Sequence, residues 1–133
     1  MNHTLDASAL VAYLEAEPGG DVVAVLLADP NAVCFAHSMN LCEVYYQGIR
    51  RKGVPAAQAA MASLFADGVI ERSDMSRSFW QRVGELKARG RVSLPDCVCI
   101  SLAQEIGGDV VTSDHGEFDP LVPLSVVPIC FIR

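Results

Sequence analysis

The stretch Asp109-Val110-Val111-Thr112-Ser113-Asp114 decides the fold class, because it has the apolar, β-branched centre of a buried strand and ends on a carboxylate. A second strand-like run, at 2–6, ends in the same way on Asp6. The carboxyl ends of parallel strands share one rim of a sheet, and ligands bind at that rim in open α/β folds. We therefore expect Asp6 and Asp114 to lie close together there.

Strand-like and helical segments alternate along the chain. The patterns predict strands at 2–6, 32–36, 69–71, 109–113 and 125–132, and helices at 7–16, 20–28, 38–52, 55–66, 76–89 and 95–106. Gly and Pro residues mark several ends, for instance Pro18-Gly19-Gly20 after the first helix. This alternation predicts an α/β fold, namely a three-layer α/β/α sandwich with a mostly parallel central sheet.

Size and composition set the broad class. A length of 133 residues predicts a single domain over residues 1–133, and 51% hydrophobic residues with 20% charged ones argue against disorder. No apolar run approaches the roughly 18 residues of a membrane span, and no cationic segment precedes the first apolar residues. The five cysteines lie in apolar runs, where an odd number indicates buried free thiols. We expect a cytoplasmic protein without membrane contact.

Charge is segregated along the sequence. Nine of the ten Lys and Arg residues lie between Arg50 and Arg91, although the net charge is −6. A basic middle between acidic flanks would suit an anionic metal-collecting pocket beside a surface that holds a phosphate backbone. An equally simple interpretation is a set of solvated helices, and the balance does not make the chain an obvious nucleic-acid binder. The candidates for backbone contacts are Arg50, Arg51, Lys52, Arg82 and Arg89.

Two further acids, Glu43 and Asp96, stand in predicted helices. Glu43 has apolar neighbours and no Lys or Arg within a turn, and a buried, unpaired glutamate is costly unless it is protonated or bound to a cation. Asp96, Asp6 and Asp114 each also have a structural interpretation, as a residue at a helix start or turn. Four carboxylates on one rim would repel one another unless Mg²⁺ or Mn²⁺ neutralised them.

Several neighbouring polar residues are weaker candidates. Glu117 and Asp119 lie close enough in the sequence to Asp114 to supply a further ligand, or they could simply be solvated in a loop. The residues placed to hydrogen-bond the carboxylates, and so to fix their rotamers, are Ser8, Asn40 and Thr112. Each of these is also an ordinary cap or strand residue. The three histidines form no ligand spacing, and we expect them to be solvated.

The acids lie in four ordered motifs, which are Leu5-Asp6-Ala7-Ser8-Ala9-Leu10, Asn40-Leu41-Cys42-Glu43-Val44, Leu94-Pro95-Asp96-Cys97, and Val111-Thr112-Ser113-Asp114 followed by Glu117-Phe118. This set resembles the motifs of PIN-domain nucleases, most closely the VapC-type toxin ribonucleases of bacterial toxin–antitoxin pairs. The resemblance spans nearly the whole chain. It implies that Asp6, Glu43, Asp96 and Asp114 form an acidic quartet that holds Mg²⁺ or Mn²⁺. It further implies single-stranded RNA cleavage, a homodimer and inhibition by a small antitoxin.

Other functions fit the residues less well or remain open. A phosphatase acting through an aspartyl phosphate would need a second Asp two residues after Asp6, where Ser8 stands, and a receiver domain would need a late Lys, but none follows Lys87. No Gly-rich phosphate loop is present. A stand-alone RNA-processing nuclease remains an alternative, as does a catalytically idle interaction module with the same fold.

Overall fold

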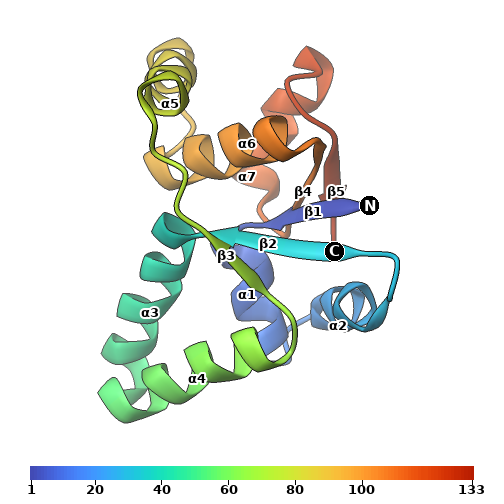
Figure 1. The fold of residues 1–133 in the computed structure, drawn as a ribbon, viewed down its shortest axis with the longest axis vertical. Helices are drawn as coiled ribbons and strands as arrows, with labels where there is room; N and C mark the ends of the chain where they lie inside the picture. The colour runs from blue at the N-terminus through green and yellow to red at the C-terminus, as the bar shows by residue number, and fades with distance from the viewer.

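The fold is built on a five-stranded sheet in which every neighbouring pair of strands is parallel. A computed structural model describes all 133 residues. The strand order is β3-β2-β1-β4-β5 (Figure 1). The strands are β1 (Asn2–Leu5), β2 (Val33–His37), β3 (Ile70–Arg72), β4 (Gly108–Thr112) and β5 (Ile129–Phe131). The predicted α/β architecture is confirmed, and the sheet is parallel throughout.

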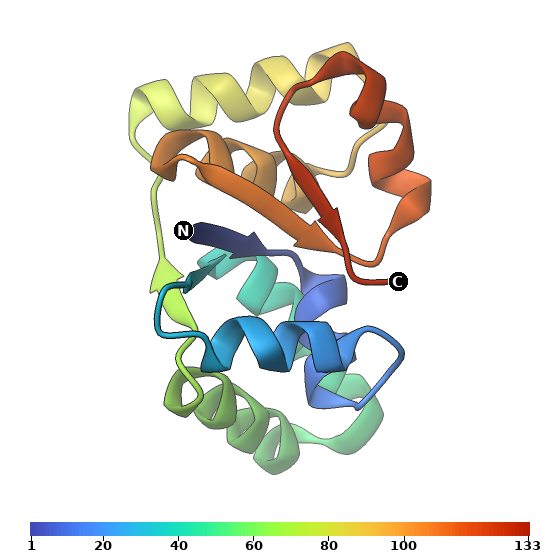
Figure 2. The same cartoon turned by 90° about the vertical axis from the view of Figure 1, so that its right-hand side faces the viewer.

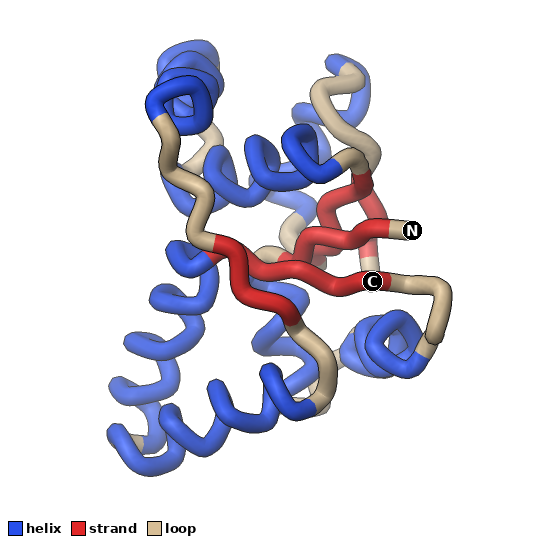
Figure 3. The backbone as a smooth tube through the Cα atoms, in the orientation of Figure 1, coloured by secondary structure: helices blue, strands red, loops and turns tan.

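Helices cover both faces of this sheet and form the two outer layers (Figure 2 and Figure 3). One layer contains α1 (Ala7–Leu14), α2 (Gly20–Ala28), α3 (Ser38–Lys52) and α4 (Val54–Ala66). The other contains α5 (Arg77–Arg89), α6 (Leu94–Ile106) and the short α7 (His115–Phe118), which leads into a 3-10 helix, Asp119–Leu124. None of the helices combines the length and the apolar character that crossing a membrane requires.

Strand β4 contributes to both cores, because successive side chains of a strand point to opposite faces. Leu5 is fully buried in the core under α1–α4, together with Val111 of the neighbouring strand β4. Val110 of β4 packs into the second core, under α5, α6 and α7. Burying a side chain such as Leu5 contributes about 1.5–3 kcal/mol. Both outer layers therefore hold β1 and β4 in place, and the strand ends that follow are fixed as well.

The turn between α1 and α2 depends on glycine. Gly19 has a φ of +94°, a region that side chains with a Cβ rarely adopt. A Cβ on Gly20 would lie only 2.3 Å from the carbonyl oxygen of Ala12. The start of α2 therefore packs directly on the backbone of α1, and this close approach brings Glu17 and Pro18 beside the carboxyl end of the sheet.

The C-terminal region differs from the sequence prediction. The predicted strand at 125–132 is reduced to β5, Ile129–Phe131, and the segment before it forms α7 and the 3-10 helix. Pro128 lies within the predicted strand, directly before β5, and proline lacks the N–H that a strand ladder needs. Ser125 has a φ of +51°, so the chain turns there before it enters β5.

Two of the three histidines are buried, so the expectation that all would be solvated is wrong. The Nδ1 atom of His3 lies 2.6 Å from Asp109 on the paired position of β4. Nδ1 of His37 accepts from the backbone N–H of Met39 at 3.0 Å, which caps α3, and its ring stacks on Phe79. Each buried ring has polar partners, and these contacts offset the cost of removing its nitrogen atoms from water.

The cysteines also depart from the expectation in one position. Cys42 is exposed on α3, whereas Cys34, Cys97 and Cys99 are buried and Cys130 is partly buried. All five are free thiols, as expected. Cys42 lies between Leu41 and Glu43 in the sequence, and its position on the helix turns it toward solvent while Leu41 and Val44 face the core.

Candidate active site

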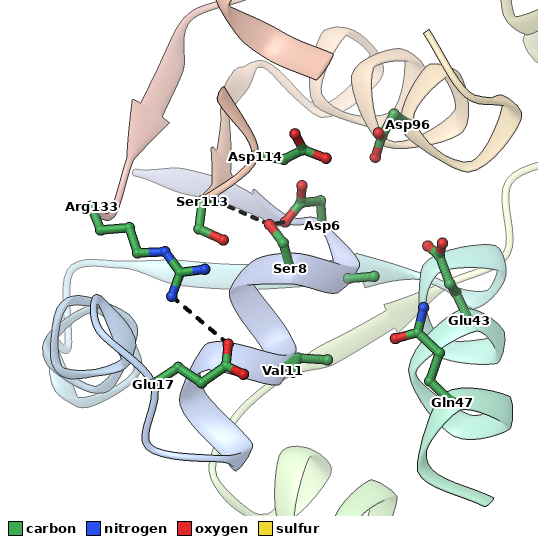
Figure 4. Close-up of a pocket in the computed structure, with 11 residues that line it drawn as sticks. Asp6, Ser8, Val11, Glu17, Glu43, Gln47, Asp96, Ser113, Asp114 and Arg133 are labelled. Atoms are coloured by element: carbon green, nitrogen blue, oxygen red, sulfur yellow. Dashed lines mark hydrogen bonds and ion pairs between the residues drawn. The ribbon is translucent and has the colours of Figure 1, made fainter. Parts of the chain in front are cut away.

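One cavity of about 270 Å³ lies at the carboxyl ends of β1 and β4. Its walls contain all four predicted acids, Asp6, Glu43, Asp96 and Asp114 (Figure 4). Asp6 follows β1, Asp114 lies just after β4, Glu43 lies on α3, and Asp96 lies in the first turn of α6. Four segments that are distant in the sequence therefore bring their carboxylates into one cavity, because the parallel sheet directs both strand ends to this rim.

The carboxylate of Asp6 is the most firmly held of the four. Its Oδ1 accepts hydrogen bonds from the backbone N–H of Ala9 at 2.9 Å and from the Ser8 hydroxyl at 2.7 Å, which caps α1. Its Oδ2 accepts from the Thr112 hydroxyl at 2.6 Å. Burial raises the pKa of Asp6, the bond from Thr112 opposes that rise, and the nearby charge of Asp114 adds to it. The side chain is thus fixed in place, in surroundings that favour its neutral form or a bound cation.

Asp96 and Glu43 are acids without a cationic partner. Burial and then the negative charge of Asp6 raise the pKa of Asp96 to about 7. Burial also raises the pKa of Glu43, followed by the charges of Asp6 and Glu117. Neither carboxylate forms an ion pair with a Lys or Arg. Their mutual repulsion is therefore uncompensated by any side chain of the protein.

Asp114 has a local structural role as well as a place in the cavity. Its Oδ1 accepts from the backbone N–H of Glu117 at 3.0 Å and so caps α7. The carboxylate of Glu117 accepts from the backbone N–H of Ser93 at 3.3 Å, before α6, and does not line the cavity. Asp119 is exposed, pairs with His115 at 2.8 Å and lies outside the cavity. Of the two extra candidates, only Glu117 lies near the quartet.

The three residues expected to hydrogen-bond the carboxylates divide into two groups. Ser8 and Thr112 both donate to Asp6. For Asn40 the expectation is wrong, because its Nδ2 donates to the carbonyl oxygen of Pro95 at 3.1 Å and its buried Oδ1 has no partner. Asn40 packs against the first turn of α6, so its amide reaches the backbone there before it can reach a carboxylate. It joins α3 to α6 one residue away from Asp96.

The five basic candidates lie outside the cavity. They lie in the last turn of α3 and on α5. Arg51 and Lys52 contact Glu15 at 3.9 and 2.8 Å, and Arg82 contacts Glu105 at 3.1 Å. The remaining two are Arg50, which lies over the ring of Tyr46, and Arg89, which is exposed. Exposed ion pairs contribute little stability, so these side chains can exchange partners, and contact with a phosphate backbone stays a prediction.

The cavity is also lined by four polar residues that the sequence patterns did not indicate. These are Glu17, Gln47, Ser113 and Arg133. Gln47 could have been found from helical spacing, since it lies one turn after Glu43 on the same face. Ser113 stands inside the strand-end motif that pointed to Asp114. Glu17 and Arg133 carry no such signal, because only the α1–α2 turn and the pairing of β5 bring them to the rim.

The donor chemistry of the cavity suits a hard divalent cation. Mg²⁺ and Mn²⁺ prefer oxygen ligands, and the quartet supplies eight carboxylate oxygens that lack cationic partners. The structure contains no group of three His, Cys, Asp or Glu side chains already arranged to hold a metal ion. A bound ion would therefore require the carboxylates that line the cavity to come closer together than they are here.

The comparison with protein families identifies the fold. A family model for the PIN domain matches residues 4–120. The chain belongs to the PIN-domain family. PIN domains are nucleases, so membership implies hydrolysis of nucleic acids by this chain. No protein of curated function matches the sequence significantly.

Solved structures confirm the architecture of this PIN domain. VapBC2 from Rickettsia felis, bound to a promoter DNA fragment, superposes with a TM-score of 0.76 at 17% identity, over 98% of each chain. DNA-bound VapBC from Salmonella typhimurium gives 0.75 at 16% identity, over 100% of this chain and 99% of the other. VapC20 of Mycobacterium tuberculosis, a toxin that cleaves the Sarcin-Ricin loop, gives 0.71 at 18% identity, over 89% and 94%. At these identities the likeness shows the fold.

Proposed function

We propose that residues 1–133 form one endoribonuclease domain that hydrolyses phosphodiester bonds in single-stranded RNA with Mg²⁺ or Mn²⁺. Asp6, Glu43, Asp96 and Asp114 would hold one or two ions, with Glu117 near enough to join them. The observation that carries this proposal is the cavity that collects four carboxylates from four segments without a single cationic partner among them. Such an arrangement is unfavourable in a purely structural site and favourable around a cation.

The chain's own residues would orient the reaction. A bound divalent ion would supply an activated water and positive charge near the phosphate. Thr112 and Ser8 fix both oxygens of Asp6, so that this carboxylate needs no reorganisation when it binds an ion. Asn40 ties α3 to the first turn of α6 and sets the separation of Glu43 and Asp96. The cavity is a recess in the surface, which an unpaired strand or loop enters more readily than a duplex does.

The biological role that we propose is that of the toxin in a type II toxin–antitoxin pair. The support comes from the fold, since the similar structures include VapBC complexes from Rickettsia felis and Salmonella typhimurium. A small antitoxin would then bind this chain and block the cavity, and the active form would be a homodimer. A small open reading frame next to the coding sequence, whose product relieves growth arrest when co-expressed, tests this role. Cleavage without such a neighbour would favour a stand-alone RNA-processing nuclease.

Cleavage itself is tested with the purified chain and a labelled RNA that contains unpaired segments. Wild type is expected to cut in the presence of Mg²⁺ or Mn²⁺, to stop when EDTA is added, and to resume when the metal is restored. Asp6→Asn serves as the matched inactive variant. Metal-independent cutting that survives in Asp6→Asn would point to a contaminating nuclease, and a folded protein that never cuts would favour an idle interaction module.

A further inference from the structure

The cavity that holds the quartet contains a single cationic side chain, Arg133. Five of the eleven residues that line it are acids, and these are the quartet and Glu17. In Figure 4 Arg133 stands at one end with Ser113, whereas Glu43 and Gln47 stand at the opposite end. Arg133 also lies beyond residues 4–120, the part that matches the PIN-domain model, so the shared family pattern does not account for it.

We propose that Arg133 is a substrate-binding residue whose guanidinium holds a backbone phosphate of the single-stranded RNA at the end of the cavity opposite Glu43. This inference rests on the proposed function and adds a residue to it. It gives the cavity two ends, one for the metal and the reacting phosphate and one for a neighbouring phosphate of the same strand.

Two nitrogen atoms of the Arg133 guanidinium are free to donate hydrogen bonds to a ligand. Its Nη1 donates to the carbonyl oxygen of Pro18 at 3.0 Å and lies 3.8 Å from the Oε1 of Glu17. Its Nε and Nη2 have no hydrogen-bond partner, and 42% of the side chain is exposed. Arginine binds phosphate through two parallel N–H groups, and Nε with Nη2 forms one such pair. One edge of the group is therefore anchored and the other is open to a ligand.

Arg133 does not neutralise the quartet. It forms no hydrogen bond or ion pair with Asp6, Asp114 or Glu43, and its only acidic contact is the long one to Glu17. The guanidinium lies in the same cavity as the quartet, but its contacts are with Pro18 and Glu17. An ion pair with the quartet therefore does not explain why Arg133 lines the cavity.

The backbone of Arg133 is held at a fixed position. The preceding residue, Ile132, donates from its N–H to the carbonyl oxygen of Thr112 at 3.0 Å, which continues the β4–β5 pairing. The carbonyl oxygen of Arg133 accepts from Nε2 of His115 at 2.7 Å, and the ring of His115 stacks on Phe131 with centroids 4.1 Å apart. These contacts hold the backbone of Arg133 beside the cavity, so the side chain extends into the cavity from a fixed position.

The electrostatics of the cavity call for such a residue. An RNA strand brings several phosphates near a wall of carboxylates, and a metal ion offsets the repulsion only at the reacting phosphate. Ser113 stands at the same end as Arg133, and its hydroxyl has no hydrogen-bond partner. Arg133 and Ser113 together provide a donor surface for the next phosphate along the strand.

The test measures RNA binding separately from cleavage. Fluorescence anisotropy with a labelled single-stranded RNA of about 10 nucleotides is recorded in Mg²⁺ on the Asp6→Asn background, which prevents cutting. Arg133→Gln is compared with Arg77→Gln, which removes the same charge from an exposed position on α5 outside the cavity. We expect Arg133→Gln to weaken binding about 10-fold more than Arg77→Gln, and to lower the slope of log affinity against log salt by about 0.7. Arg133→Lys should be intermediate.

The outcomes separate this inference from the proposed function. If wild type cleaves RNA but Arg133→Gln binds it as well as Arg77→Gln does, the inference fails and the function stands. If wild type does not cleave but its binding depends on Arg133, the inference stands and the function fails. A chain that neither binds nor cleaves RNA overturns both. Higher cleavage by Arg133→Gln than by wild type would make Arg133 an inhibitory plug and also overturn the inference.

A second variant tests the same surface in the opposite direction. Glu17→Gln removes the one carboxylate near the guanidinium while leaving the anchor on Pro18 in place. We expect it to tighten RNA binding by about 2- to 5-fold, because the phosphate then has no competing anion beside Arg133. Unchanged or weaker binding in a folded Glu17→Gln protein would contradict the assignment. Thermal melts of both variants check that the fold is retained.

Discussion

Thr112 donates a 2.6 Å hydrogen bond to Oδ2 of Asp6, which lies 106 residues earlier in the chain. The same hydroxyl oxygen accepts from the backbone N–H of Asp114 at 2.9 Å. One threonine at the end of β4 therefore sets the position of an acid from β1 and of the acid that follows its own strand. This side chain therefore links two members of the quartet across the β1–β4 pair.

Thr112→Val should disturb both stability and activity. The buried Oδ2 of Asp6 loses its donor, which should cost about 1–3 kcal/mol in the free energy of unfolding. Because the Thr112 bond lowers the pKa of Asp6, its loss should raise that pKa further and move the rising limb of the pH–rate profile to higher pH. Chemical denaturation and pH–rate measurements check these effects. Thr112→Ser keeps the hydroxyl and should restore both properties, and a valine variant with wild-type behaviour would show that the bond is dispensable.

Asp6→Asn should abolish cleavage without unfolding the chain. Asparagine is as good an N-cap as aspartate, so α1 keeps its cap, and a buried charge is removed. We expect the melting temperature to stay the same or rise, while cleavage falls by at least ~100-fold because a ligand is lost. Asp96→Asn should behave alike. Full activity in either purified variant would remove the quartet from the mechanism.

Stability without added metal should fall as the pH rises from about 4 to about 7. The folded-state pKa of Asp96 is about 7, well above its ordinary value of 3.8, so the native state retains a proton that the unfolded chain has lost. The stabilisation is complete below pH 3.8 and is lost as the pH passes through about 7. Melting temperatures across this range measure the effect.

Metal should reverse this trend. Mg²⁺ or Mn²⁺ binds the deprotonated carboxylates, so the rise in melting temperature on adding metal should grow with pH through about 7. Asp96→Asn removes one of the titrating groups and should flatten both the pH dependence and the response to metal. An equal metal response in wild type and Asp96→Asn would place the ion elsewhere.

Asp109→Ala should lower the stability of the fold without changing the rate of cleavage. Asp109 lies near the amino end of β4 and contacts the buried His3 at 2.6 Å, away from the cavity. Loss of this partner should destabilise the fold by about 1–3 kcal/mol and leave kcat unchanged below the melting temperature. A large fall in kcat with unchanged stability would connect this pair to the active site.

Much of the fold and the placement of the acids followed from local sequence patterns. The helix predicted at 38–52 is present and ends before Gly53 as the pattern indicates, whereas its N-cap, His37, is not a residue that the pattern indicated. Asp6 and Asp114 were placed on one rim by the rule for parallel strands, and the structure lines one cavity with both. These features depend on short-range signals, such as strand runs and glycine stops, that a single sequence contains.

The remainder depends on contacts between distant segments. The burial of His3 follows from Asp109 on a neighbouring strand, and Asn40 bonds to Pro95, 55 residues further along the chain. Arg133 reaches the cavity only because β5 pairs with β4 and the α1–α2 turn packs beside it. No periodicity in the sequence reports such contacts, so no local pattern indicates that Arg133 lines the cavity.

The strand order β3-β2-β1-β4-β5 also decides when during synthesis the acidic cavity can form. β1 leaves the ribosome first but lies in the middle of the sheet, and one of its neighbours, β4, is among the last elements to emerge. Until then Asp6 lacks Thr112, and the rim lacks Asp114. A chain that stops before β4 therefore cannot assemble the cavity, because it lacks both the donor that fixes Asp6 and one of the four acids.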